Sequence, residues 1–120
     1  MPPLLVAVCL AAPPLAVDTD FPGGNGEVEG IDQTARVVAI RPKVHPDRGW
    51  ACWWHVKLTG VTPGETLTLK VTASDGFGRP DRAMVSADGK TWTHTAAGKT
   101  AGKTITYPVA VPAAADGSVR

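Results

Sequence analysis

Apolar and polar residues alternate most regularly between Glu65 and Thr72, where three aliphatic side chains are separated by threonines and a lysine. This period of two is typical of a strand with one buried face. Similar runs predict further strands at 27–31, 36–41, 51–59, 82–87, 91–95 and 103–111. No window beyond the N-terminal segment has the period of a helix. The pattern predicts an all-β protein, an antiparallel immunoglobulin-like β-sandwich of about seven short strands.

The segment 49–60, which includes the predicted strand at 51–59, contains three of the four tryptophans. Side chains alternate between the two faces of a strand, so we expect its even positions to face the core: Cys52, Trp54, Val56 and Leu58. The odd positions Trp53, His55 and Lys57 then point the other way. Such a tryptophan contacts the second sheet, another domain or a ligand such as a sugar ring. We predict that these three residues form a domain interface or a ligand platform.

Turn residues organise the C-terminal half of the chain. Asp88-Gly89 predicts a tight hairpin with a primed turn. We expect Asp88, Gly89 and the following Trp92 to be structural anchors, like Trp54. Pro108 predicts that the strand at 103–111 lies at a sheet edge. Residues 111–120 resemble a turn that leads into a further strand, so we expect the chain to be a fragment that lacks its C-terminal part.

The N-terminal segment is apolar, with no charged side chain in residues 1–17. Its apolar run at 4–12 is shorter than the ~20 residues that cross a bilayer, so we expect no transmembrane helix. The length suits a secretory signal peptide, although no basic residue precedes the run. We predict a signal peptide at 1–17, a β-sandwich domain at 18–120 and a secreted or periplasmic location. A buried N-terminal helix and a cytoplasmic location are the alternatives.

Charge and histidine spacing exclude several function classes. The 12 basic and 11 acidic residues give a net charge of +1, without the basic stripe of a nucleic-acid binder. Cys52 and His55 are three residues apart, which on a strand places them on opposite faces and prevents a shared metal. His45 and His94 stand alone in sequence. We therefore expect no catalytic set and no metal site in this chain.

Four sequence blocks resemble a known domain in their order and spacing. They are Asp20-Phe-Pro-Gly-Gly-Asn25, Gly49-Trp-Ala-Cys-Trp-Trp54, Pro80-Asp-Arg-Ala83 and Ser86-Ala-Asp-Gly-Lys-Thr-Trp92. Together they are similar to the N-terminal β-sandwich domain of bacterial cytosolic-type zinc carboxypeptidases. The last block also resembles, with one residue fewer, the Asp-box of sialidase-type propellers.

The carboxypeptidase resemblance implies a peptidase domain later in the same polypeptide. There a His-x-x-Glu pair and a later His would hold zinc, and a further Glu would act as general base; this chain has no His-x-x-Glu. The resemblance thus implies a non-catalytic accessory domain that packs on the peptidase domain and shapes access to it. A secreted carbohydrate- or ligand-binding sandwich and a purely structural sandwich are the alternatives.

Overall fold

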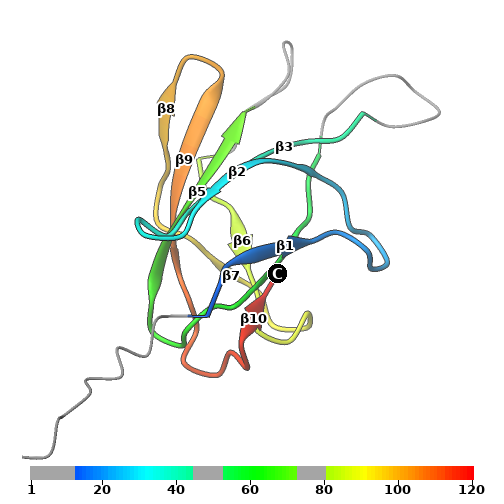
Figure 1. Cartoon of the computed structure of the whole chain (residues 1–120), viewed down its shortest axis with the longest axis vertical. Helices are drawn as coiled ribbons and strands as arrows, with labels where there is room; N and C mark the ends of the chain where they lie inside the picture. Colours follow the sequence, from blue (N-terminus) through cyan, green and yellow to red (C-terminus); the bar gives the residue numbers. More distant parts are fainter. Residues whose placement is uncertain (1–12, 45–52, 73–80) are drawn as a thin grey trace, which may run out of the picture.

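The computed structural model describes residues 13–44, 53–72 and 81–120, and in this part of the chain it contains strands but no helix (Figure 1). The strands are β1 (Ala16–Asp18), β2 (Glu27–Asp32), β3 (Val37–Arg41), β4 (Lys57–Thr59), β5 (Thr66–Thr72), β6 (Met84–Val85), β7 (Thr93–His94), β8 (Lys99–Ala101), β9 (Thr104–Ala110) and β10 (Ser118–Val119). The predictions for 27–31, 36–41, 65–72 and 103–111 are confirmed as β2, β3, β5 and β9, and the turn after Val111 leads into β10.

One layer is a five-stranded sheet in the order β2-β3-β5-β9-β8. Its neighbours are antiparallel except β3 and β5, which are parallel, with Val37 opposite Thr68. The exception arises because the chain leaves this sheet after β3, forms β4 in the other layer and then returns. Parallel neighbours need such a crossover connection, whereas antiparallel neighbours need only a hairpin.

The second layer consists of the sheet β1-β4-β10 and the two-stranded β6-β7. The two parts are joined where Ser86 and Arg120 exchange backbone hydrogen bonds, each with an N···O distance of 2.9 Å. This reciprocal exchange is the bonded pair of an antiparallel ladder. The layer therefore runs β1-β4-β10-β6-β7, and the predicted all-β sandwich is confirmed.

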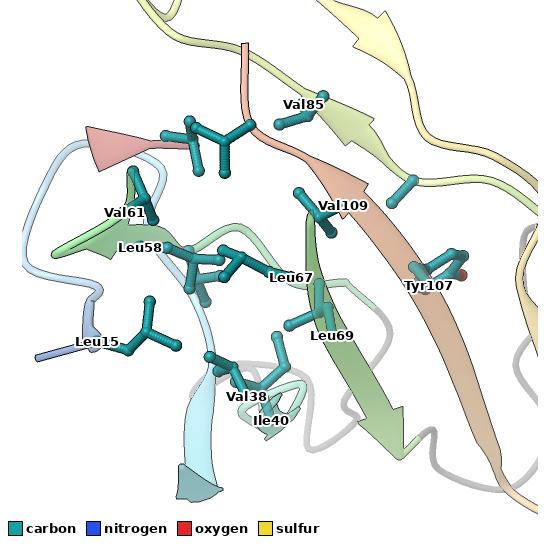
Figure 2. Packing of buried hydrophobic residues seen from close by; sticks show 14 of the residues in the cluster. Leu15, Val38, Ile40, Leu58, Val61, Leu67, Leu69, Val85, Tyr107 and Val109 are labelled. Carbon is teal, nitrogen blue, oxygen red and sulfur yellow. The ribbon is translucent and has the colours of Figure 1, made fainter. Parts of the chain in front are cut away.

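The core lies between these layers and is built from alternate residues of each strand. In β5 and β9 the buried side chains are Leu67, Leu69, Val71, Ile105, Tyr107 and Val109. Figure 2 shows several of them directed toward residues of the opposite layer, among them Leu58 and Val61. The predicted alternation in the strand at 65–72 is therefore confirmed, since its intervening residues are exposed or half-buried.

One predicted strand is shorter than expected, and two other local predictions were wrong. Among described residues of the predicted strand at 51–59, β4 begins only at Lys57, and before it a single isolated bridge joins His55 to Asn25. The chain just before Asn25 forms a turn, in which the Gly24 N–H donates to the Phe21 carbonyl. The bridge therefore does not extend into a strand on that side. Cys52 and His45 lie outside the described residues.

The predicted primed hairpin is instead a seven-residue loop, since Val85 pairs with Thr93 and residues 86–92 lie between them. Pro108 is not in an edge strand either, because β9 lies between β5 and β8. However, β8 pairs only with residues 104–106, so Pro108 lies beyond the end of that ladder. A proline is tolerated there because no N–H has to be donated to β8.

Residues just before the predicted domain boundary are part of the sandwich. Leu15 is 2% exposed and belongs to the core, and Ala16 and Val17 pair with β4 as part of β1. The Gln33 side chain binds the Leu15 backbone twice, accepting from its N–H at 2.7 Å and donating to its carbonyl at 2.8 Å. The folded domain thus includes residues that the predicted signal segment of 1–17 contains, while residues 1–12 lie outside the described part.

A partly buried ion pair joins the starts of the parallel strands β3 and β5. The guanidinium of Arg36 binds both carboxylate oxygens of Glu65, and it also donates to the carbonyls of Pro13 and Gly60, each at 2.8 Å. The two side chains are 12% and 15% exposed. Hydrogen bonding to Arg36 lowers the pKa of Glu65, and the N–H of Thr62 adds to this effect. The Arg36 side chain therefore joins the end of the β2–β3 turn at 33–36 to Pro13 and to the turn at 60–65.

We predict that Leu15→Ala lowers the free energy of unfolding by about 2–4 kcal/mol, because it removes buried methyl groups and leaves a cavity. Val44→Ala, at a 55% exposed position, is the control and should change it by less than about 0.5 kcal/mol. Urea denaturation of the purified chain gives both values. Equal effects of the two substitutions would contradict the place of Leu15 in the core.

We predict that Glu65→Gln destabilises the domain by about 2 kcal/mol at neutral pH, because it leaves the Arg36 charge without its partner. The folded-state pKa of Glu65 is lowered, so its contribution is present above the ordinary value of 4.5 and is lost as the pH falls toward the folded-state value. The difference between wild type and variant should therefore shrink as the pH falls below about 5. Denaturation curves across this range test the sign, and a constant difference would refute it.

Candidate functional site

Three rings and one guanidinium from four separate segments of the chain come together in the structure. The ring of His55 lies edge-on to Phe21, with centroids 4.9 Å apart, and to Trp92 at 5.7 Å. The guanidinium of Arg120 lies over the Phe21 ring, 5.1 Å from its centroid. Edge-to-face ring pairs and cation–π contacts are both attractive. We call Phe21, His55, Trp92 and Arg120 the aromatic cluster.

Asn25 fixes the Phe21 and His55 segments to one another. Its backbone exchanges two hydrogen bonds of 2.8 Å with His55, and its side-chain amide donates to the Trp53 carbonyl at 2.6 Å. The loop before it folds tightly, because a Cβ on Gly24 would collide with the Thr19 carbonyl. Only glycine fits at that position, which brings Phe21 close enough to contact the His55 ring.

Trp92 is positioned by a loop organised around the Asp88 carboxylate. Oδ1 of Asp88 accepts hydrogen bonds from the N–H groups of Lys90 at 2.7 Å and Thr91 at 2.8 Å, and from the Ser86 hydroxyl at 3.1 Å. These bonds, led by the one from Thr91, lower the pKa of Asp88. The carboxylate replaces the backbone bonds of a tight turn, which is why a wider loop forms here instead of the predicted hairpin.

The loop also contacts the last residue of the cluster. Gly89 has a φ of +76°, and a Cβ there would approach the Arg120 guanidinium to 2.8 Å. Arg120 thus lies against Gly89 while it also covers Phe21. The predicted anchors Asp88 and Gly89 hold the loop, and through it the cluster, in place.

The predicted interface residues Trp53, His55 and Lys57 differ in their exposure to solvent. Trp53 is 43% exposed, whereas His55 and Lys57 are half-buried, with Lys57 opposite Asp18 in the β1–β4 ladder. Trp54 packs against the core from the other side, its ring centroid 6.2 Å from that of Tyr107. The structure brings His55 and Trp92 together, a contact that no sequence spacing predicted.

Sequence reasoning missed Phe21 and Arg120 as cluster members. Phe21 lies in a polar, glycine-rich segment, and the only signal for it was its place in the first of the resembling blocks. Arg120 follows β10 and reaches the cluster only because its backbone pairs with Ser86. Neither contact leaves a local pattern in the sequence, since each joins segments that are far apart along the chain.

One atom of the cluster lacks a partner. The Nε2 of His55 is shielded from solvent and has no hydrogen bond to any described residue. Buried polar atoms are nearly always paired in folded proteins, so an orphan requires an explanation. The shielding of this nitrogen shows that the His55 ring is enclosed within the cluster.

The cluster offers ring faces, ring edges and one cation, which suit packing and recognition. No group of three or more His, Cys, Asp or Glu residues that could hold a metal occurs among residues 13–44, 53–72 and 81–120. His94 is exposed in β7. The described residues therefore do not fit a zinc site.

Residues 13–44, 53–72 and 81–120 contain no helix that is long and apolar enough to cross a membrane.

The family model described as the cytosolic carboxypeptidase N-terminal domain matches residues 17–116. The chain belongs to this family. Its match covers most of the 120 residues, and the carboxypeptidase resemblance of the four sequence blocks is confirmed. No significant match was found among curated proteins.

Solved structures share the fold. A metallo-carboxypeptidase from Burkholderia cenocepacia superimposes with a TM-score of 0.70 and 21% identity, covering 88% of this chain and 27% of that one. The same four values hold for a protein described as a carboxypeptidase from Burkholderia mallei ATCC 23344. A protein described as a carboxypeptidase A from Shewanella denitrificans OS-217 gives a TM-score of 0.68 and 17% identity, covering 87% of this chain and 27% of that one. The chain of this family member thus spans about a quarter of the length of these proteins.

We predict that Asp88→Ala loosens the loop at 86–92, because three hydrogen bonds lose their acceptor. The thermal midpoint should fall, and Trp92 should become more accessible to a collisional quencher of tryptophan fluorescence. Asp116→Ala, at an exposed turn position, is the matched control and should change neither quantity. Unchanged quenching in Asp88→Ala would show that Asp88 does not position Trp92.

Proposed function

We propose that this chain is the non-catalytic N-terminal accessory domain of a zinc metallocarboxypeptidase. The domain packs on a peptidase domain that this chain does not contain and shapes access to the active site. The observation that carries the proposal is the family match over residues 17–116, together with the quarter of the length that the chain spans in carboxypeptidases of the same fold. Zinc would be held by residues of the peptidase domain.

The aromatic cluster supplies a surface of suitable chemistry for domain packing. Aromatic residues and arginine are enriched at protein interfaces, where they contribute much of the binding energy. Trp53 adds an apolar ring that is 43% exposed, and Asn25 holds its backbone next to the cluster. A neighbouring domain would cover this ring. We propose Trp53, His55 and Lys57 as interface residues on this basis.

We propose that an N-terminal signal directs the protein to the periplasm or the medium. Because Leu15 and β1 belong to the folded domain, we expect any cleavage to fall before residue 13. N-terminal sequencing of the mature protein from its native host checks this position.

The proposed function is tested first in the gene, by extending the reading frame past the Arg120 codon. A continuing frame with His-x-x-Glu and a later His supports the proposal. The encoded full-length polypeptide should then bind zinc and release C-terminal residues from peptides. A full-length protein without these motifs and without peptidase activity would overturn it.

Trp53→Ala in that full-length protein tests the interface. We predict that loss of the ring weakens docking, so that calorimetry resolves two unfolding transitions where wild type shows one, and that the KM for peptides changes. Val28→Ala is the control, because Val28 is 48% exposed in β2, on the other layer. A single transition in both variants would exclude Trp53 from the interface.

The second candidate function is a carbohydrate- or ligand-binding module, and the exposure of Trp53 favours it. An exposed indole is a common platform for stacking. Titration of the chain with oligosaccharides, followed by tryptophan fluorescence, separates the two functions. Saturable quenching that disappears in Trp53→Ala would support the module, whereas no quenching at millimolar sugar would exclude it.

A further inference from the structure

Strand β6 has an unpaired edge at Met84. On one side of β6 the backbone bonds β7: the N–H of Thr95 donates to the Ala83 carbonyl at 2.9 Å. On the other side, the N–H and carbonyl of Ser86 bond Arg120. Backbone groups of successive strand residues point to alternate sides. Met84 is two residues from Ser86, so its N–H and carbonyl point toward the β10 side.

The register shows what would bond Met84. Arg120 and Ser86 form a bonded antiparallel pair, and the next bonded pair along the ladder lies two residues further on in each strand. It would join Met84 to the second residue after Arg120. No described residue takes this place, and the Met84 side chain is 46% exposed. Figure 1 shows the C-terminus at the end of β10, near β6.

The surroundings of this edge are apolar. A recess between the two layers opens beside it and is lined by Met84, Val85, Val109, Val119 and Arg120, among other residues. An extended segment that continues β10 would place every second side chain over this recess. Both the backbone edge and the adjacent apolar surface therefore fit a strand.

We propose that the edge at Met84 is a docking site for an extended segment, and that its occupant is the stretch of polypeptide that directly follows Arg120 in the longer protein. The inference rests on the proposed function for the identity of this occupant. The family model ends at residue 116, beside β10, while carboxypeptidases of the same fold are about four times as long as the matched region. Because the matched family is an N-terminal domain, a longer protein of this family would continue from this end of the domain.

The consequence is a rigid connection between domains. A segment that extends β10 along β6 leaves the sandwich as a strand, with its direction set by the ladder, instead of as a flexible linker. It also covers a strand edge that would otherwise be free to pair with another molecule. The accessory domain would thus hold the peptidase domain in a fixed orientation, with the aromatic cluster and Trp53 close to the point of connection.

The experiment adds a four-residue tail, Thr-Val-Thr-Lys, after Arg120 of the full 120-residue chain. Main-chain pairing gives such strand addition its affinity and tolerates many sequences, so a strand-forming tail tests the edge without the native continuation. The matched control tail is Thr-Pro-Thr-Lys, because proline lacks the N–H that would donate to the Met84 carbonyl. Amide hydrogen exchange of Met84 is measured by NMR in the untailed, tailed and control chains.

We expect the Thr-Val-Thr-Lys tail to slow exchange of the Met84 amide at least tenfold relative to the untailed chain, and the proline tail to slow it much less. The Val85 amide, which faces β7, serves as the internal reference and should not change. Far-UV circular dichroism confirms that the three chains fold alike. Equal Met84 exchange rates in the three chains would overturn the docking site.

Two other outcomes overturn the choice of occupant. Protection of Met84 in the untailed chain that rises with protein concentration, with a dimer in size-exclusion chromatography, would assign the edge to a second copy. A reading frame that ends at Arg120 would remove the proposed segment altogether. Failure of the tail experiment leaves the proposed function standing, whereas loss of the peptidase motifs in the gene removes that function and leaves the tail result unaffected.

Discussion

The ion pair between Arg36 and Glu65 is the constraint on which the arrangement of the two layers depends. Strands β3 and β5 are parallel, so the chain between them must cross to the other layer and return beside β3 in the correct register. Arg36 and Glu65 lie just before these strands, and their pairing fixes both starts at one point. The same guanidinium holds the carbonyl of Gly60 in the crossover. A one-residue slip of β5 would move its apolar side chains out of the core and separate the two charges.

The second layer depends on contacts between distant parts of the chain in a similar way. β1, β4 and β10 contribute two or three residues each, and β6 and β7 contribute two. Such short strands gain little from their own ladders, so they rely on burial of residues such as Leu15, Leu58 and Val119 against the larger sheet. The aromatic cluster forms where these short strands end. Its geometry is therefore set by loops that hydrogen bonds hold in place, chiefly those of Asn25 and Asp88.

This division explains why the candidate surface lies where it does. The larger sheet is regular and supplies about half of the buried core residues that the structure describes, whereas the smaller layer carries the loops, the exposed Trp53 and the unpaired edge of β6. Functional surfaces are often formed by loops on a rigid scaffold. In this domain the scaffold is the sheet β2-β3-β5-β9-β8, and the surface proposed to meet a peptidase domain is on the layer opposite it.

The sequence by itself determined the longer strands, because period-two alternation over five to seven residues reports directly which side chains are buried. It also determined the family, because the order and spacing of the four sequence blocks match those of the family even where the contacts they make cannot be predicted.

The sequence did not determine where β4 begins or the width of the loop at 86–92. The alternation around Trp53 is typical of a strand, but a strand also needs a neighbouring backbone with which to pair. Asn25 provides only a single bridge, to His55. Likewise, Asp88-Gly89 favours a tight turn locally, but the Asp88 carboxylate accepts hydrogen bonds from the backbone N–H groups of Lys90 and Thr91, and a wider loop forms. Contacts such as those of Arg36 with Glu65 and Phe21 with His55 were decided by tertiary structure alone, because they join segments whose distance in space has no counterpart in their spacing along the chain.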